Sequence, residues 1–174
     1  MSRRTFAIAA ARSVLALESP LITANANPLV EKYLDQGLEK YDAGNYQEAI
    51  IDYSKAIEIN PLNVETYVNR ASAKNSLGDY EGAIDDYTKA IDVDPQNADA
   101  DNNRGVSKSY LEDYQGAISD YTKVIEINPQ YASAYYNRGI ARELVNDLAG
   151  ACSDWRKAAD FGLKEPAQWV KNQC

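Results

Sequence analysis

The sequence predicts an all-α protein: a right-handed solenoid of four helical hairpins followed by a short capping helix. Three prolines, Pro61, Pro95 and Pro129, stand at equal intervals, and most residues between them recur in step. The interval, roughly 34 residues, is typical of stacked helical repeats. Such a stack displays an extended surface and offers no deep catalytic cleft, so the period itself favours an interaction protein over an enzyme.

Four further series share the period and define the packed side of each hairpin. They are the small residues Gly37, Ala71, Gly105 and Gly139; the alanines Ala49, Ala83, Ala117 and Ala151; the aromatic residues Tyr53, Tyr87, Tyr121 and Trp155; and the aspartates Asp52, Asp86, Asp120 and Asp154. Small residues recur where two helices must approach closely. We therefore expect the aromatic rings to fill the space beside the small residues of the first helix.

The predicted units are 30–63, 64–97, 98–131 and 132–165. Turn signals such as Gly44-Asn45 divide each unit into two helices. A closing proline ends the unit because it lacks an amide hydrogen and disfavours helix at the preceding residue. The side chains at the start of each second helix are expected to accept from its free backbone N–H groups. These residues are Asn45, Asp79, Asp113 and Asp147.

A short segment, 166–174, follows the fourth unit. Pro166 begins it, and Ala167, Val170 and Cys174 fall on one helical face. The last repeat of a solenoid needs a cap because its apolar flank is otherwise open. We predict a capping helix there.

Residues 1–26 have the three parts of an export signal. The basic start Ser2-Arg3-Arg4-Thr5-Phe6 precedes an apolar stretch, and Ala24-Asn25-Ala26 supplies a small-x-small cleavage site. The start also resembles the twin-arginine class. The general secretory route is equally open. Arg12 interrupts the apolar stretch and leaves two pieces, each too short to span a membrane. The alternatives are an uncleaved extension of a cytoplasmic protein and an organellar transit peptide.

The repeated residues from Val30 to Glu165 resemble the tetratricopeptide repeat family, whose units carry a small residue in the first helix, Tyr and Ala in the second, and a closing Pro. The resemblance implies that the first helix of each hairpin lines a concave groove in which extended peptides lie. The C-terminal Ala-Cys-Ser-Asp-Trp-Arg-Lys-Ala-Ala is also similar to repeat proteins of marine cyanobacteria. That similarity implies a periplasmic or thylakoid-lumen location.

The first helices carry candidate peptide-binding residues, Asn69, Asn103 and Asn137, which recur at the same interval as the prolines. A side-chain amide has both a donor and an acceptor, so a ladder of amides can pair with a peptide backbone of any sequence. Asp35 takes this place in the first unit, so the ladder consists of three asparagines, which we call its rungs. The alternative is that each Asn only bonds a neighbouring helix or water.

Another branch of the family clamps an acidic C-terminal carboxylate with Lys and Arg. The equivalent places here lack cations and hold Leu34, Leu38 and Asp99, or Val68, Ser72 and Ser133 in the next register. The expected groove has Glu31, Glu65 and Asp99 towards one end and Tyr136, Ile140 and Leu144 towards the other. A neutral or basic segment with an apolar anchor is therefore the better ligand.

An arginine follows each rung, and an aspartate recurs in each second helix. We predict structural ion pairs, each contributing about 0.5 kcal/mol or more where partly buried. They involve Arg70, Arg104 and Arg138 and the aspartates Asp86, Asp120 and Asp154. The alternative role for the arginines is anion binding in the groove.

The composition argues against catalysis and against anionic partners. The chain of 174 residues has a net charge of −8 and no histidine, so it lacks the usual general base and the commonest transition-metal ligand. Acidic proteins repel phosphate backbones and anionic lipid. We expect a monomeric, non-enzymatic adaptor for a protein or peptide, with no cofactor, metal, nucleic acid or membrane insertion. A self-associating scaffold is the alternative, because stacked repeats have flat flanks.

The two cysteines, Cys152 and Cys174, lie in the second helix of unit four and at the end of the predicted cap. Helical spacing places them nearly level across this antiparallel pair. We predict a disulfide if the protein reaches an oxidising compartment. Two buried, reduced thiols are the alternative in the cytoplasm.

Overall fold

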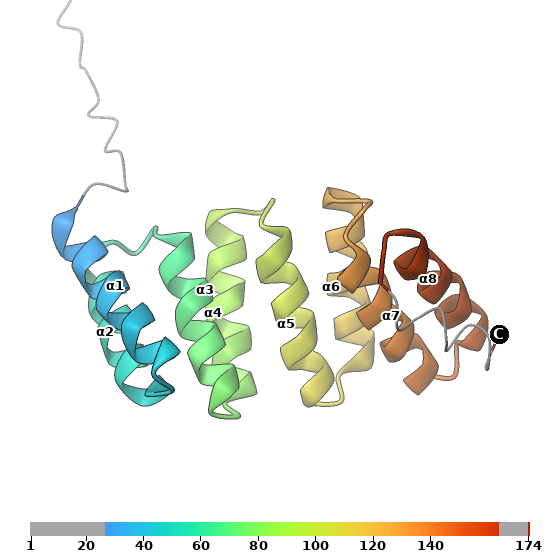
Figure 1. Cartoon of the computed structure of the whole chain (residues 1–174), viewed down its shortest axis with the longest axis horizontal. Helices are drawn as coiled ribbons and strands as arrows, with labels where there is room; N and C mark the ends of the chain where they lie inside the picture. The colour runs from blue at the N-terminus through green and yellow to red at the C-terminus, as the bar shows by residue number, and fades with distance from the viewer. Residues whose placement is uncertain (1–26, 164–173) are drawn as a thin grey trace, which may run out of the picture.

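The computed structural model describes residues 27–163 and Cys174, and this part of the chain contains eight helices and no strand. Their bounds are α1 Pro28–Asp42, α2 Tyr46–Ile59, α3 Val64–Ser76, α4 Tyr80–Val93, α5 Ala98–Tyr110, α6 Tyr114–Ile127, α7 Ala132–Leu144 and α8 Leu148–Asp160. Each helix packs against the next in the chain, which produces a single elongated row (Figure 1). The all-α solenoid is confirmed. The predicted export signal, 1–26, and the capping helix, apart from Cys174, lie outside the described residues.

Each hairpin closes around an aromatic ring that lies against a small residue. Tyr53, Tyr87, Tyr121 and Trp155 are at most 2% exposed. A Cβ atom added at Gly105 would lie 2.7 Å from Cε1 of Tyr121, closer than real Cβ atoms come to a neighbour. The predicted close approach of the two helices is therefore confirmed.

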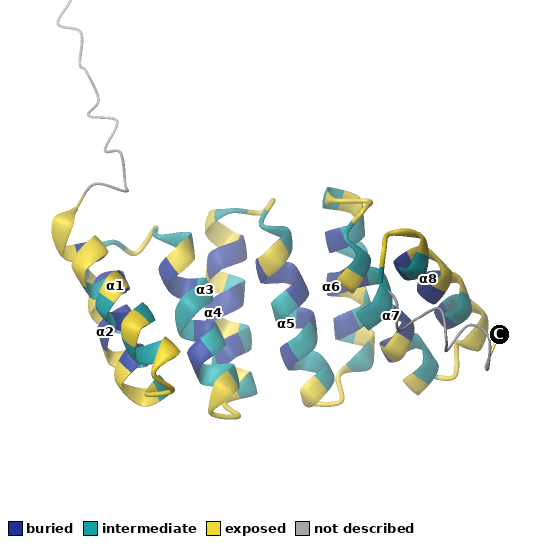
Figure 2. Cartoon of the chain, in the orientation of Figure 1, coloured by how far each residue is buried: buried dark blue, intermediate teal, exposed yellow. Residues whose placement is uncertain are grey.

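The same rings connect one repeat to the next. Tyr53 of α2 shares a buried cluster with Ala73 of α3, and Tyr121 of α6 shares one with Ala141 of α7. Figure 2 shows the buried residues continuing along the row of helices. Every hairpin is thus stabilised partly by its neighbours, as expected of a solenoid.

Three of the four predicted caps of the second helices are present. Asp79, Asp113 and Asp147 accept from the N–H groups of the glycines three residues later, Gly82, Gly116 and Gly150, at 2.9 to 3.0 Å. The prediction for Asn45 is wrong, because its side chain makes no capping hydrogen bond. The corresponding third residue is Glu48, where the other three repeats have glycine.

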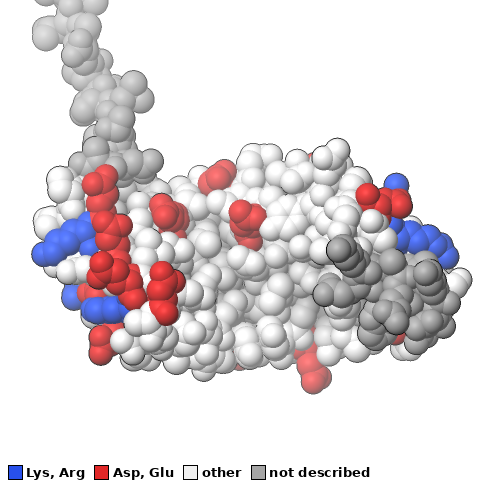
Figure 3. Space-filling view, viewed as in Figure 1, with Lys and Arg blue, Asp and Glu red and all other residues white. Residues whose placement is uncertain are grey.

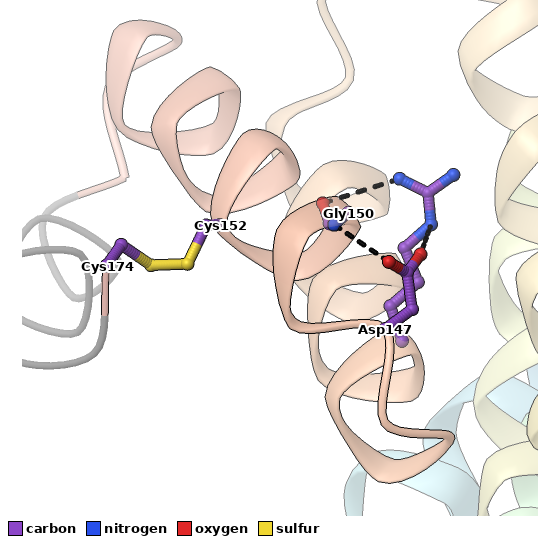
Figure 4. Close-up of a disulfide and its surroundings, with 5 residues drawn as sticks. Asp147, Gly150, Cys152 and Cys174 are labelled. Atoms are coloured by element: carbon purple, nitrogen blue, oxygen red, sulfur yellow. Dashed lines mark hydrogen bonds and ion pairs between the residues drawn. A yellow bond between two sulfur atoms is a disulfide. The ribbon is translucent and has the colours of Figure 1, made fainter.

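Cys152 of α8 is joined to Cys174 by a disulfide, with a Cα–Cα distance of 5.7 Å. Figure 4 shows this bridge beside α8, together with the Asp147 cap at the start of the same helix.

Among the described residues, no helix has the length and apolar content needed to span a membrane.

Candidate functional site

One face of the first helices, α1, α3, α5 and α7, carries three hollows, and we call it the groove face. On each of these helices, the residues that line the hollows follow helical spacing and lie on one side. In α3 they include Glu65, Val68, Ser72 and Ser76. The three hollows differ in polarity and in their place along the helices.

The acidic hollow has a volume of about 570 Å³ and lies at the first turns of α1, α3 and α5. Its apolar lining is Val30, Leu34, Leu62, Val64 and Val68, and its carboxylates are Glu31, Glu65, Asp94 and Asp99. None of these four carboxylates forms an ion pair with a Lys or Arg in residues 27–163. In Figure 3, acidic side chains gather over the end of the molecule where α1 lies, with basic side chains beside them, whereas the middle of the face shows few charges.

The central hollow, about 310 Å³, lies towards the last turns of α3 and α5. Its walls include Asn103 of α5 and four tyrosines, Tyr41, Tyr80, Tyr87 and Tyr110. Tyr80 and Tyr110 stack with their ring centroids 4.6 Å apart. This hollow therefore offers a flat aromatic surface next to an amide.

The terminal hollow, also about 310 Å³, lies between α5 and α7. Asn137 lines it together with Val106, Tyr110, Ile140 and Leu144. Tyr110 and Leu144 keep 64% and 51% of their surface exposed, although large apolar side chains usually avoid water. An apolar side chain of a ligand can cover them.

The three predicted rungs do not occupy equivalent surroundings. Asn103 and Asn137 each line a hollow, whereas Asn69 lines none of the three. Asn102, which is not one of the predicted rungs, donates to Oδ1 of Asn103 at 3.2 Å and accepts from Nδ2 of Asn137 at 3.4 Å. Two rungs are therefore connected through a neighbouring amide, while Nδ2 of Asn103 and Oδ1 of Asn137 make no hydrogen bond within residues 27–163.

The arginines lie beside the rungs but point into the repeats. Each donates two hydrogen bonds to the aspartate of its own second helix, at 2.6 to 2.9 Å, in the pairs Arg70–Asp86, Arg104–Asp120 and Arg138–Asp154. The remaining guanidinium nitrogen donates to a hydroxyl of the preceding repeat, on Ser54, Thr88 or Thr122. These bonds occupy the guanidinium groups and tie consecutive repeats together.

A second series of basic residues pairs with the buried aspartates of the second helices. Lys74, Lys108 and Arg142 lie 2.8 Å from Asp86, Asp120 and Asp154, and Lys40 pairs with Asp52 in the first repeat. This series recurs once in every repeat, so the sequence contains its signal, although these cations are not among the predicted site residues. Each of these four aspartates is at most 4% exposed and is paired with two cations.

Two buried aspartates have pKa values shifted in opposite directions. Burial works to raise the pKa of Asp52, but hydrogen bonds from Lys40 and Lys55 outweigh it and hold the pKa below its ordinary value of 3.8. At Asp101 burial prevails and raises the pKa, despite the nearby Lys123 and Arg104. Both groups lie inside the packed repeats, where they act on stability.

A family model described as a TPR repeat matches residues 37–75, 71–108 and 110–144. The chain belongs to the tetratricopeptide repeat (TPR) family. The three matched stretches include most of the groove face, among them all three candidate asparagines. No curated protein matches the chain in sequence.

Solved structures include similar TPR folds. A crystal structure of MamA is 28% identical with a TM-score of 0.74, covering 76% of this chain and 77% of that chain. The first TPR domain of Spaghetti (RPAP3), bound to the HSP90 peptide SRMEEVD, is 26% identical with a TM-score of 0.66, covering 67% and 93%. The Arabidopsis OM64 TPR domain is 29% identical with a TM-score of 0.63, covering 66% and 94%.

Proposed function

We propose that this protein is a non-enzymatic adaptor that holds an extended segment of another protein on its groove face, in the manner of an assembly factor for a larger complex. The observation that carries the proposal is the pairing of a candidate amide with a hollow, aromatic and polar at Asn103 and mostly apolar at Asn137. An amide can bond the backbone of a segment while the hollow beside it takes a side chain. This combination suits a peptide ligand.

The similarity to a peptide-bound domain supports the mode of binding but not the same ligand. The RPAP3 domain is bound to the peptide SRMEEVD, in which three of the last four residues are acidic. On the groove face of this chain, carboxylates line the acidic hollow, and the arginines next to the rungs are already paired with buried aspartates. An acidic segment would therefore be repelled, and a neutral or basic one is favoured.

Selection from a library of random dodecapeptides displayed on phage tests the proposal. We expect the full chain to enrich specific peptides, and the triple change of Asn69, Asn103 and Asn137 to Ala to weaken their binding at least about tenfold, since hydrogen bonds of roughly 1 kcal/mol each are lost together. Asn69→Ala alone should have the smallest effect, because Asn69 lines none of the hollows.

The thermal unfolding midpoint of the triple variant is the control, and it should stay close to that of the parent. Selection that enriches no peptide would contradict the proposal. Equal binding by a folded triple variant would contradict a peptide-binding role for the asparagines. It would favour the alternative that each Asn only bonds a neighbouring helix or water.

A self-associating scaffold is the second candidate, because large apolar side chains are exposed among the described residues. Besides Tyr110 and Leu144, Leu148 is 55% exposed. Light scattering during size-exclusion chromatography separates the two functions. A mass that rises with concentration favours the scaffold, and a constant monomer mass favours the adaptor.

The proposed location is an exported compartment, the periplasm or a thylakoid lumen, reached after cleavage behind Ala26. Intact-mass analysis of the native protein tests this, because the mature chain would begin at Asn27. Replacing Arg3 and Arg4 by Lys should stop export by the twin-arginine route. Full-length chain recovered from the cytoplasm would contradict export. The resemblance to repeat proteins of marine cyanobacteria stays a prediction.

A further inference from the structure

We propose that the acidic hollow selects a Lys or Arg, flanked by an apolar residue, in the partner segment that lies on the groove face. This inference rests on the proposed function and adds a specificity to it. The apolar lining and the ring of carboxylates come from three consecutive repeats, so the complete hollow exists only in the assembled solenoid.

The carboxylates of this hollow differ from the acidic groups inside the repeats. Asp52, Asp86, Asp120 and Asp154 are buried and each is paired with two cations. Glu31, Glu65 and Asp99 are exposed, and no Lys or Arg of residues 27–163 pairs with them. Their negative charge is therefore available to a ligand.

The position of Asp99 is fixed by a hydrogen bond. Oδ1 of Asp99 accepts from the hydroxyl of Tyr131 at 2.6 Å, which leaves Oδ2 for a further donor. Burial, followed by this bond, raises the pKa of the Tyr131 hydroxyl, so it remains a donor at neutral pH. A Lys has three N–H donors and an Arg five, so a single basic side chain can donate to the remaining oxygen of Asp99.

Two other ligands fit less well. A metal ion needs several acidic ligands close together, and the described part of the chain has no such group of three. An anion would need free N–H groups at the first turns of α3 and α5, but Asn63 and Asn97 accept from Thr66 and Ala100 there, each at 2.9 Å. A long organic cation with an apolar stem is the ligand class that remains.

The hollows also fix the spacing of the segment. Glu65 lines the acidic hollow and Ser76 lines the central hollow, and both belong to α3. At about 1.5 Å per residue, the distance between them along the helix is roughly 16 Å. An extended peptide covers this distance in roughly five residues. The basic residue and the apolar anchor should therefore be at least that far apart.

The phage-displayed dodecapeptide library tests the specificity without assuming a ligand. The full chain should enrich peptides with Lys or Arg next to an apolar residue and a second apolar residue about five positions away. Changing Glu31 and Glu65 to Gln should weaken binding of the strongest selected peptide by roughly tenfold at low salt. Glu65→Lys should instead enrich peptides with Asp or Glu.

Glu126→Gln is the matched control, because Glu126 belongs to α6 and lies outside the three hollows. It should change binding less than about twofold. Enriched peptides without basic residues, or equal loss in the Glu126 control, would overturn this inference and leave the adaptor function intact. Failure to enrich any peptide would overturn both.

Discussion

Arg104 of α5 and Asp120 of α6 share two hydrogen bonds, 2.9 Å from Nε and 2.7 Å from Nη2. Nη1 of the same arginine donates to the hydroxyl of Thr88, in the repeat before, at 3.2 Å. One side chain thus holds the two helices of its own hairpin together and attaches them to the preceding hairpin. The Arg104 and Asp120 side chains are only 15% and 6% exposed, so water competes weakly for these bonds.

Arg104→Met should lower the free energy of unfolding by about 2 kcal/mol, because it leaves a buried carboxylate with Lys108 as its only remaining cation within residues 27–163. Urea unfolding followed by circular dichroism measures this. The control is Lys89→Met, which removes a pair to Asp92 in which the two side chains are 64% and 61% exposed. It should cost less than about 0.5 kcal/mol. Similar losses in the two variants would contradict a structural role for the arginine.

Tyr53→Phe should raise the free energy of unfolding by about 1 kcal/mol, because the buried Tyr53 hydroxyl has no hydrogen-bond partner within residues 27–163. Tyr87→Phe is the matched control. The Tyr87 hydroxyl lies 3.1 Å from Oγ of Ser72, and losing that bond should lower the free energy by about 1 kcal/mol. The first repeat has Leu38 where Ser72 stands, which explains the difference. Equal destabilisation by both changes would show that Tyr53 has a partner.

Stability should depend on pH through Asp52. Its pKa is lower in the folded chain than the ordinary 3.8, so its contribution is complete above that pH and is lost as the pH falls through the folded value. The difference in unfolding free energy between the parent and Asp52→Asn should be largest at neutral pH and shrink in acid.

Asp101→Asn should give the opposite trend. The folded chain raises the pKa of Asp101, so the contribution of this group is greatest below pH 3.8 and is lost as the pH rises through the folded value. Urea unfolding at a series of pH values compares the two variants. If the unfolding free energies of both variants changed with pH in the same way, the opposite pKa shifts assigned to Asp52 and Asp101 would be contradicted.

Replacing both Cys152 and Cys174 by Ser should destabilise the C-terminal repeat by about 3 kcal/mol, the loop-closure value for cysteines at a sequence separation of 22. Hydrogen exchange should show the loss in α8 and little change in α3 and α4. The parent protein in reductant should behave like the double variant. Alkylation of both cysteines after unfolding without reductant would show that the bond is absent.

Much of the packing and capping of the repeats could be inferred from the periodicity of the sequence. The part that could not be inferred has a physical cause. The close contact of Gly105 with Tyr121 and the caps at Asp79, Asp113 and Asp147 follow from residues near in sequence or repeated in register. The missing cap at Asn45 does not follow from the series of capping residues; the first repeat differs from the others there, with Glu48 where they have Gly82, Gly116 and Gly150. The cations that complete the aspartate sites recur as regularly as the arginines, so the same periodicity could have revealed them.

The sequence alone determined the repeat, the hairpins and the packed side of every helix, because identical spacing places equivalent residues in equivalent surroundings. Only the tertiary structure decided which groove residues act together. Asn69 and Asn103 occupy the same register, yet only Asn103 lines a hollow, since each hollow is formed by side chains of neighbouring repeats that differ from one another. The acidic hollow has the same origin: Glu31, Glu65 and Asp99 are each a full repeat apart in the chain and meet only when three repeats stack.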